Sequence, residues 1–141
     1  MSKAHLRKTD ELTLLDRICK EMTASKRITN EHKTQLSAAF GKRLENALQA
    51  LAEKRIKRYT FKPSQRVIWI VVGKERDYQI IPRAEFCTCD DFYFRVIDEE
   101  VHLCYHLIAQ KLAEALDEYD TIEEYDDLYE ALMREWRKPS L

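Results

Sequence analysis

The 141-residue sequence predicts an α+β protein, with N-terminal helices, a small β-hairpin unit followed by a helix, and a C-terminal acidic amphipathic helix. Three observations indicate this fold class. Apolar residues recur at helical spacing in several segments of the chain. A run of β-branched and aromatic residues at 67–72 is typical of a strand. Finally, only two glycines and three prolines in a chain that is 35% charged indicate a globular, helix-rich protein.

Two helices are expected in the N-terminal region. Thr9 can cap the first helix, whose apolar face would then be formed by Leu12, Leu15, Cys19 and Met22. Cys19 is therefore interpreted as a small buried hydrophobic residue. Thr29 or Asn30 can cap the second helix. Its apolar stripe is formed by Leu36, Phe40, Leu44, Ala47, Leu48 and Leu51. We expect the helical pattern to continue beyond this stripe as far as Pro63.

The N-terminal half of the chain is basic and the C-terminal half is acidic. Residues 1–66 contain 16 Lys or Arg against 7 Asp or Glu, and residues 67–141 contain 8 against 18. The basic half could bind nucleic-acid phosphates, or it could lie against the acidic half of the same chain or of a second copy. Cations interleaved with an aromatic ring give the candidate nucleic-acid-binding residues, which are Arg43, Lys54, Arg55, Lys57, Arg58, Tyr59, Lys62 and Arg66. For the rings of Tyr59 and Phe61, packing into the core is the favoured alternative.

A β-hairpin is expected after Pro63. Its first strand is the apolar run 67–72, in which Trp69 is expected to be a core residue. Residues 73–77 would form the loop, and residues 78–81 the returning strand. The hairpin would then lie directly beneath the cysteine-rich segment that follows it.

Residues 86–109, FCTCDDFYFRVIDEEVHLCYHLIA, contain three of the four cysteines of the chain. Thiolate sulfur and imidazole nitrogen are the ligands that zinc prefers, and a structural zinc site uses four of them. Cys87 and Cys89 point to the same side of an extended segment, so both can reach one ion. Residues two apart on a helix diverge by about 200°. Cys104 and His106 must therefore lie at the start of a helix, which also favours the thiolate form of Cys104.

One alternative for the ligand set remains open. On a helix that begins earlier, His102 and His106 would share a face and Cys104 would be left out. Cys87, Cys89, Cys104 and His106 are preferred, because the residues before His102 are typical of a loop. This set predicts one structural Zn²⁺ with no open coordination position.

The order Cys87-x-Cys89 followed by Cys104-x-His106 resembles the SWIM zinc finger, whose pattern is C-x-C-x(n)-C-x-H. The resemblance covers about residues 65–116. It implies a β-hairpin and helix around one zinc ion, and a role in DNA binding or protein–protein contact without catalysis. The position between the last two ligands is often basic in the family and is Tyr105 here.

The last expected element is a helix over residues 121–136, with Thr121 and Glu124 as a capping box. One face is apolar and much of the other is acidic, which is typical of core packing or of a docking helix. The expected organisation is a basic helical region at 1–64, a zinc-binding unit at 65–116 and an acidic C-terminal helix at 117–141.

Nucleic-acid binding through the basic segment at 54–66 is the function that the sequence favours. The alternative is an adaptor in a DNA-repair, transcription or ribosome-associated complex, which binds a protein through its acidic finger loop and C-terminal helix. No phosphate-binding loop or nucleophile motif is present, so neither an enzyme nor a small-molecule substrate is expected. Since there is no apolar span or secretory signal, we expect a cytoplasmic protein, with nucleoid association as one option, and no membrane contact.

Overall fold

The computed structural model describes residues 8–84, 86–89 and 103–137. Helices and strands alternate in blocks along the chain, and they confirm the expected α+β fold class. The elements are α1 (Lys8–Ser25), α2 (Asn30–Phe40), α3 (Lys42–Ala52), β1 (Ile56–Lys62), β2 (Arg66–Val72), β3 (Asp77–Ile81), η1 (Pro82–Ala84), β4 (Phe86–Cys87), α4 (Tyr105–Leu116), β5 (Asp120–Tyr125), η3 (Asp126–Leu128) and α5 (Tyr129–Trp136). None of the helices in these ranges has the length and apolar character of a membrane span.

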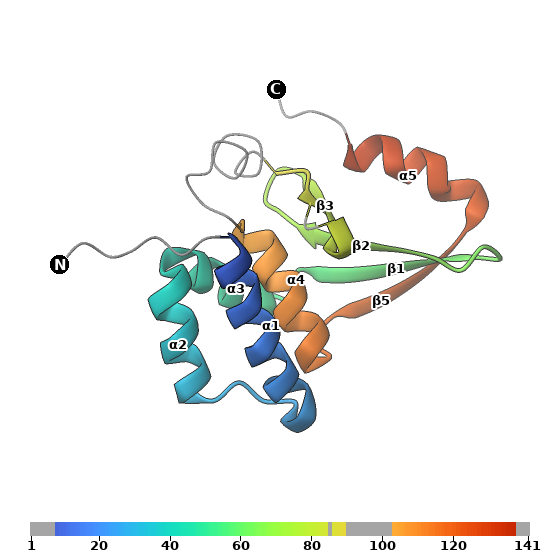
Figure 1. Ribbon diagram of the computed structural model, residues 1–141. Coiled ribbons are helices and arrows are strands. Elements are labelled where there is room, and N and C mark those ends of the chain that lie inside the picture. Colours follow the sequence, from blue (N-terminus) through green and yellow to red (C-terminus); the bar gives the residue numbers. More distant parts are fainter. Residues whose placement is uncertain (1–7, 85, 90–102, 138–141) are drawn as a thin grey trace.

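The strands form one five-stranded sheet in the order β4-β3-β2-β1-β5. All neighbours are antiparallel except β1 and β5, which run parallel. Helices α1 to α4 gather on one side of the molecule, and α5 lies by itself on the other side of the sheet (Figure 1). Successive side chains of β2 face opposite sides of the sheet. Trp69 and Val71 belong to the core beneath the helices, and Ile70 packs with α5.

The expected second helix is two helices in the structure. Gly41 separates α2 from α3 and has a φ of +57°, a conformation that glycine adopts without the steric cost of a Cβ atom. The backbone N–H of Gly41 donates to the Ser37 carbonyl oxygen and ends α2. The apolar stripe nevertheless stays on one side of both helices, since Leu36, Phe40 and Leu44 are all buried in the same core.

The expectation that helix continues from residue 52 to Pro63 is wrong. The helix ends at Ala52, and β1 follows from Ile56. Ile56 packs into the core beneath the helices, whereas Tyr59 and Phe61 pack with α5. Alternation of side chains between the two faces of a sheet is typical of a strand. The antiparallel pairing of β1 with β2 outweighs the helical preference of Lys and Arg. Pro63 lies in the turn between β1 and β2.

The expected helix at 121–136 is wrong in its first half. Thr121 and Glu124 lie in β5, so they form no capping box, and only Tyr129–Trp136 is helical. Met133 and Trp136 pack against Phe61 and Ile70 of the sheet. The apolar stripe of α5 is therefore covered by the protein's own sheet and offers no free docking surface.

The hairpin prediction is confirmed. Strands β2 and β3 fall within one residue of the expected ranges, and Trp69 is buried with the ring of Tyr119 4.8 Å from its own. Helix α4 begins at Tyr105 with Cys104 as the residue before its first turn, as the spacing of Cys104 and His106 requires. The hairpin and α4 are the two elements that hold the candidate metal ligands.

Candidate metal centre

Cys87 and Cys89 lie at the end of the sheet, where β4 leaves β3. Cys87 pairs with Ile80 in the strand register, and Thr88, which lies between the two cysteines, is hydrogen-bonded to Gln79 of β3. The backbone N–H of Thr88 donates to the Gln79 carbonyl oxygen at 3.1 Å, and the Gln79 N–H donates to the Thr88 hydroxyl oxygen at 3.0 Å. This reciprocal pair of hydrogen bonds anchors the Cys-Thr-Cys segment to β3 and keeps both buried sulfur atoms in place.

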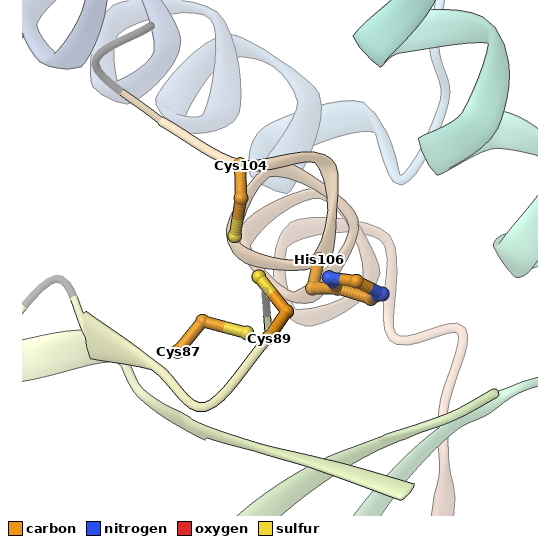
Figure 2. A group of neighbouring side chains, drawn as sticks. All are labelled: Cys87, Cys89, Cys104 and His106. Carbon is orange, nitrogen blue, oxygen red and sulfur yellow. The ribbon is translucent and has the colours of Figure 1, made fainter. Parts of the chain in front are cut away.

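Cys104 and His106 come from the start of α4. Cys104 has extended backbone angles and is the N-cap of the helix, and His106 lies in the first turn. Figure 2 shows the Cys104 sulfur directed toward the sulfur atoms of Cys87 and Cys89, with the His106 ring beside them. The structure therefore brings together the four residues that the sequence selected. His102, the alternative ligand, lies outside the described residues.

The four side chains have the composition and proximity of a zinc site. Their candidate ligand atoms all lie within 4.8 Å of one another, and all four residues are buried. Zinc bonds of about 2.0–2.3 Å would draw such a group only slightly closer. Neither ring nitrogen of His106 has a hydrogen-bond partner among the described residues. A buried imidazole without a partner is costly, so a metal ion at this point resolves the deficiency. The group could hold one zinc ion.

The thiols differ in acidity. Hydrogen bonds from the thiols of Cys87 and Cys89, and from the backbone N–H groups of Leu107 and His106, hold the pKa of Cys104 well below its ordinary value. Burial and the neighbouring sulfur atoms raise the pKa of Cys87. Because zinc binds thiolates, Cys104 is prepared for the metal, and Cys87 must release a proton on binding.

Two tyrosines and an arginine surround the histidine ligand. The ring centroids of Tyr105 and Tyr78 lie 3.9 Å and 4.4 Å from that of His106. Burial raises the pKa of the Tyr105 hydroxyl, and the nearby Arg55 guanidinium opposes that shift. Arg55, a candidate nucleic-acid contact, thus lies next to the metal centre, and its Nη1 also donates to the Val72 carbonyl oxygen at 3.3 Å.

Arg43 is also occupied within the protein. Its two Nη atoms donate to the Glu11 carboxylate at 3.1 and 2.8 Å, and Nη1 donates to the Leu103 carbonyl oxygen at 2.7 Å. Only 16% of the Arg43 side chain and 5% of the Glu11 side chain are exposed. The pair joins α1 and α3 to the residue before Cys104. The sequence analysis did not find Glu11, although a carboxylate at the 11, 15, 18, 22 spacing of the buried stripe was a signal for it.

The other candidate nucleic-acid residues lie along β1, in the turn before it and at the start of β2. Lys57 and Lys62 form ion pairs with Asp120 and Glu123 of β5. The Tyr59 ring packs edge-on against Trp136 at 4.9 Å. The remaining cations, Lys54, Arg58 and Arg66, have no ion-pair partner within the part of the chain that the structure describes. Part of the basic half therefore lies against the acidic half of the same chain, which is the second of the two interpretations of the charge division.

The chain is similar to two proteins. It is 32% identical over 99 residues to an uncharacterized protein of Archaeoglobus fulgidus, a match that covers 70% of this chain and 78% of that protein. It is 28% identical over 123 residues to the zinc finger SWIM domain-containing protein 7 homolog of Dictyostelium discoideum, covering 84% of this chain and 78% of that protein. No protein-family model and no solved structure matches the chain. The Cys3His group in the C-x-C, C-x-H order and this similarity are consistent with a SWIM-type zinc finger.

Proposed function

We propose that the chain is a non-catalytic adaptor that binds a partner protein, and that one structural zinc ion holds its sheet and helical layer together. All four candidate ligands come from the protein, so a bound zinc ion would have no open position for water or substrate. The ion would cross-link the end of β4 to the start of α4 and neutralise the charge of the thiolates. This role needs no reacting group.

The observation that carries the adaptor proposal is an uncovered part of the sheet surface next to its β5 edge. The exposed large hydrophobic residues of the described chain are Val67, Tyr125 and Leu128. The strand register places Val67 and Glu123 on either side of Thr60, and Tyr125 follows Glu123 by two residues. Val67 and Tyr125 therefore lie on the same face at one end of the sheet, and exposed apolar side chains in such a place are typical of a surface that a partner covers.

Affinity capture of the zinc-loaded chain from its own cell, before and after nuclease treatment, tests this proposal. We expect a specific protein to be retained after nuclease in near-stoichiometric amount. The reason is that an adaptor contacts its partner directly. Retention that disappears with nuclease would instead support nucleic-acid binding, and would contradict the adaptor.

Nucleic-acid binding remains a prediction, but its proposed surface is small. With Arg43, Arg55, Lys57 and Lys62 held by other groups, Lys54, Arg58 and Arg66 are the cations of the set left for phosphates. Three phosphate contacts correspond to a slope of log Kobs against log salt of about −2.7. We therefore expect weak binding to duplex DNA or single-stranded RNA with a slope no steeper than this.

A charge-reversed variant makes that expectation testable. Lys54→Glu, Arg58→Glu and Arg66→Glu together should abolish this weak nucleic-acid binding and, if the protein is an adaptor, leave the retention of the protein partner unchanged. The matched control is the triple variant Lys54→Gln, Arg58→Gln and Arg66→Gln, which removes the cations without adding acids. A slope near −6 corresponds to about seven phosphate contacts, which these three cations cannot supply, and would therefore indicate a larger nucleic-acid interface.

A further inference from the structure

Strand β5 leaves one edge of the sheet open. It is the terminal strand in the order β4-β3-β2-β1-β5, and its outer side has no strand partner among residues 8–84, 86–89 and 103–137. Figure 1 shows β5 along the outer margin of the sheet, running from the end of α4 toward α5. An edge strand presents backbone N–H and C=O groups that can pair with another extended chain. The outer edge of β5 is therefore able to accept an additional strand.

Apolar side chains lie along the same edge. Tyr125 is 70% exposed, and Leu128, three residues later, is 46% exposed. Ile122 of the same strand is half-buried. When a peptide adds to a sheet edge, its main-chain hydrogen bonds give affinity, and the contacts of its alternate side chains give specificity.

The charge of the edge selects the kind of strand that it can accept. Residues 120–128, DTIEEYDDL, contain acidic residues and no Lys or Arg. Asp120 and Glu123 pair with cations of β1, but Glu124 and Asp127 have no cationic partner among the described residues. A second copy of β5 would bring like charges together, which is unfavourable. An incoming strand that carries Lys or Arg would meet complementary charge.

The inner edge of β5 already shows this complementarity. There β1, whose sequence IKRYTFK is basic with aromatic residues, lies parallel to β5 from Lys57–Asp120 to Lys62–Tyr125 in the register. Lys62 Nζ donates to Glu123 at 2.8 Å, and Lys57 pairs with Asp120 at the other end of the strand. A basic extended segment is thus the type of chain that β5 accommodates.

We infer that the outer edge of β5 binds an extended, basic segment of the partner protein, which adds to the sheet as a further strand. The segment has Lys or Arg residues interleaved with apolar or aromatic ones. This inference rests on the proposed adaptor function and identifies the surface that performs it.

An NMR titration of the zinc-loaded, ¹⁵N-labelled full chain tests the edge directly. The probe is a capped peptide with the sequence RIKRYTFK, which is the protein's own Arg55–Lys62, and the control peptide is EIEEYTFE, with each cation replaced by Glu. We expect the basic peptide to shift the backbone amide signals of residues 120–126, and the acidic peptide to shift none of them. Absence of β5 shifts at millimolar peptide would overturn the inference. So would equal shifts in β2, since those would mean that the peptide displaces β1.

Two variants separate the edge from the rest of the acidic surface. Glu123→Lys with Glu124→Lys reverses the charge of the edge, and Glu130→Lys with Glu135→Lys makes the same change on the exposed side of α5. The edge variant should bind the basic peptide about tenfold more weakly, and the α5 variant should bind it as the wild type does. Circular dichroism and zinc content check that both variants fold. β5 amide shifts that grow with protein concentration alone would place a second copy at the edge and contradict the inference.

Capture from the native cell distinguishes this inference from the proposed function. Wild-type protein that retains a partner after nuclease, while the Glu123→Lys/Glu124→Lys variant loses it, supports both. Equal retention by the edge variant overturns the edge as the binding surface and leaves the adaptor function intact. A wild-type protein that retains no partner overturns the adaptor function itself.

Discussion

Removal of zinc with a strong chelator is expected to unfold the region around β4 and the start of α4 and to lower the melting temperature of the whole chain sharply. Structural zinc contributes about 10 kcal/mol or more in small zinc-binding units. The ligands here are buried in the main core, together with Leu103, Leu107 and Ile108 of the α4 region. Without the ion, the Cys104 thiolate and an unpartnered imidazole would remain inside that core, which is unfavourable. Metal analysis and thermal denaturation with and without chelator measure the effect.

Cysteine variants supply a matched comparison for the zinc prediction. Cys104→Ser should lose the metal, because it replaces the ligand whose thiolate form is favoured by the Cys87 and Cys89 thiols and by the backbone N–H groups at the start of α4. Cys19→Ser changes a thiol outside the ligand group, whose Sγ is 3.7 Å from the Lys111 carbonyl oxygen, and serine can keep that contact. We expect about one zinc per chain in Cys19→Ser, as in the wild type. Full zinc content in Cys104→Ser, or an unchanged melting curve after chelation, would contradict a structural zinc site.

The metal ligands could be predicted from the sequence because their chemistry and spacing are local. A Cys-x-Cys segment after a hairpin supplies two ligands from one side of an extended chain. The divergence of Cys104 and His106 on a regular helix fixed where α4 had to begin, and Cys104 is indeed its N-cap. Both arguments use residues within a few positions of each other.

The pairing of β1 with β5 could not be predicted, because it joins distant segments. Lys57 and Asp120 are 63 positions apart, and each lies in a stretch of charged residues with a plausible helical pattern. What makes the two stretches strands is their mutual pairing and charge complementarity, together with the cover that Trp136 and Met133 provide. Local propensity is a weak prior when tertiary contacts of this kind compete with it.

Arg43 was assigned to nucleic acid for a similar reason. Its sequence neighbourhood shows a cation on a helix, and the carboxylate that binds it, Glu11, lies 32 positions away. Such a residue contributes to stability through a buried ion pair rather than through an exposed charge. That distinction has a measurable consequence.

Replacement of Arg43 by Met is expected to destabilise the protein by about 3–5 kcal/mol, because it leaves the buried Glu11 carboxylate without its cation. The same change removes the hydrogen-bond donor to the Leu103 carbonyl oxygen, which precedes the ligand Cys104. Mutation of a group that holds a metal ligand in place without touching the metal typically lowers metal affinity about 10–100-fold. We therefore expect both a lower free energy of unfolding in urea and weaker zinc binding in chelator competition.

Arg17→Met is the matched control for Arg43→Met. Arg17 also pairs with a carboxylate of α1, that of Glu21 at 3.1 Å, but 51% and 48% of the two side chains are exposed. Loss of such a pair costs about 0–1 kcal/mol. Among the described residues, the hydrogen bonds of the Arg17 side chain go to Glu21 and Gln35, which are not residues of the metal centre. Glu11→Leu combined with Arg43→Met should recover part of the lost stability, since no buried charge remains, but should not restore zinc affinity, since Leu103 still lacks its donor. Equal behaviour of Arg43→Met and Arg17→Met in both measurements would show that Arg43 supports neither the core nor the metal centre.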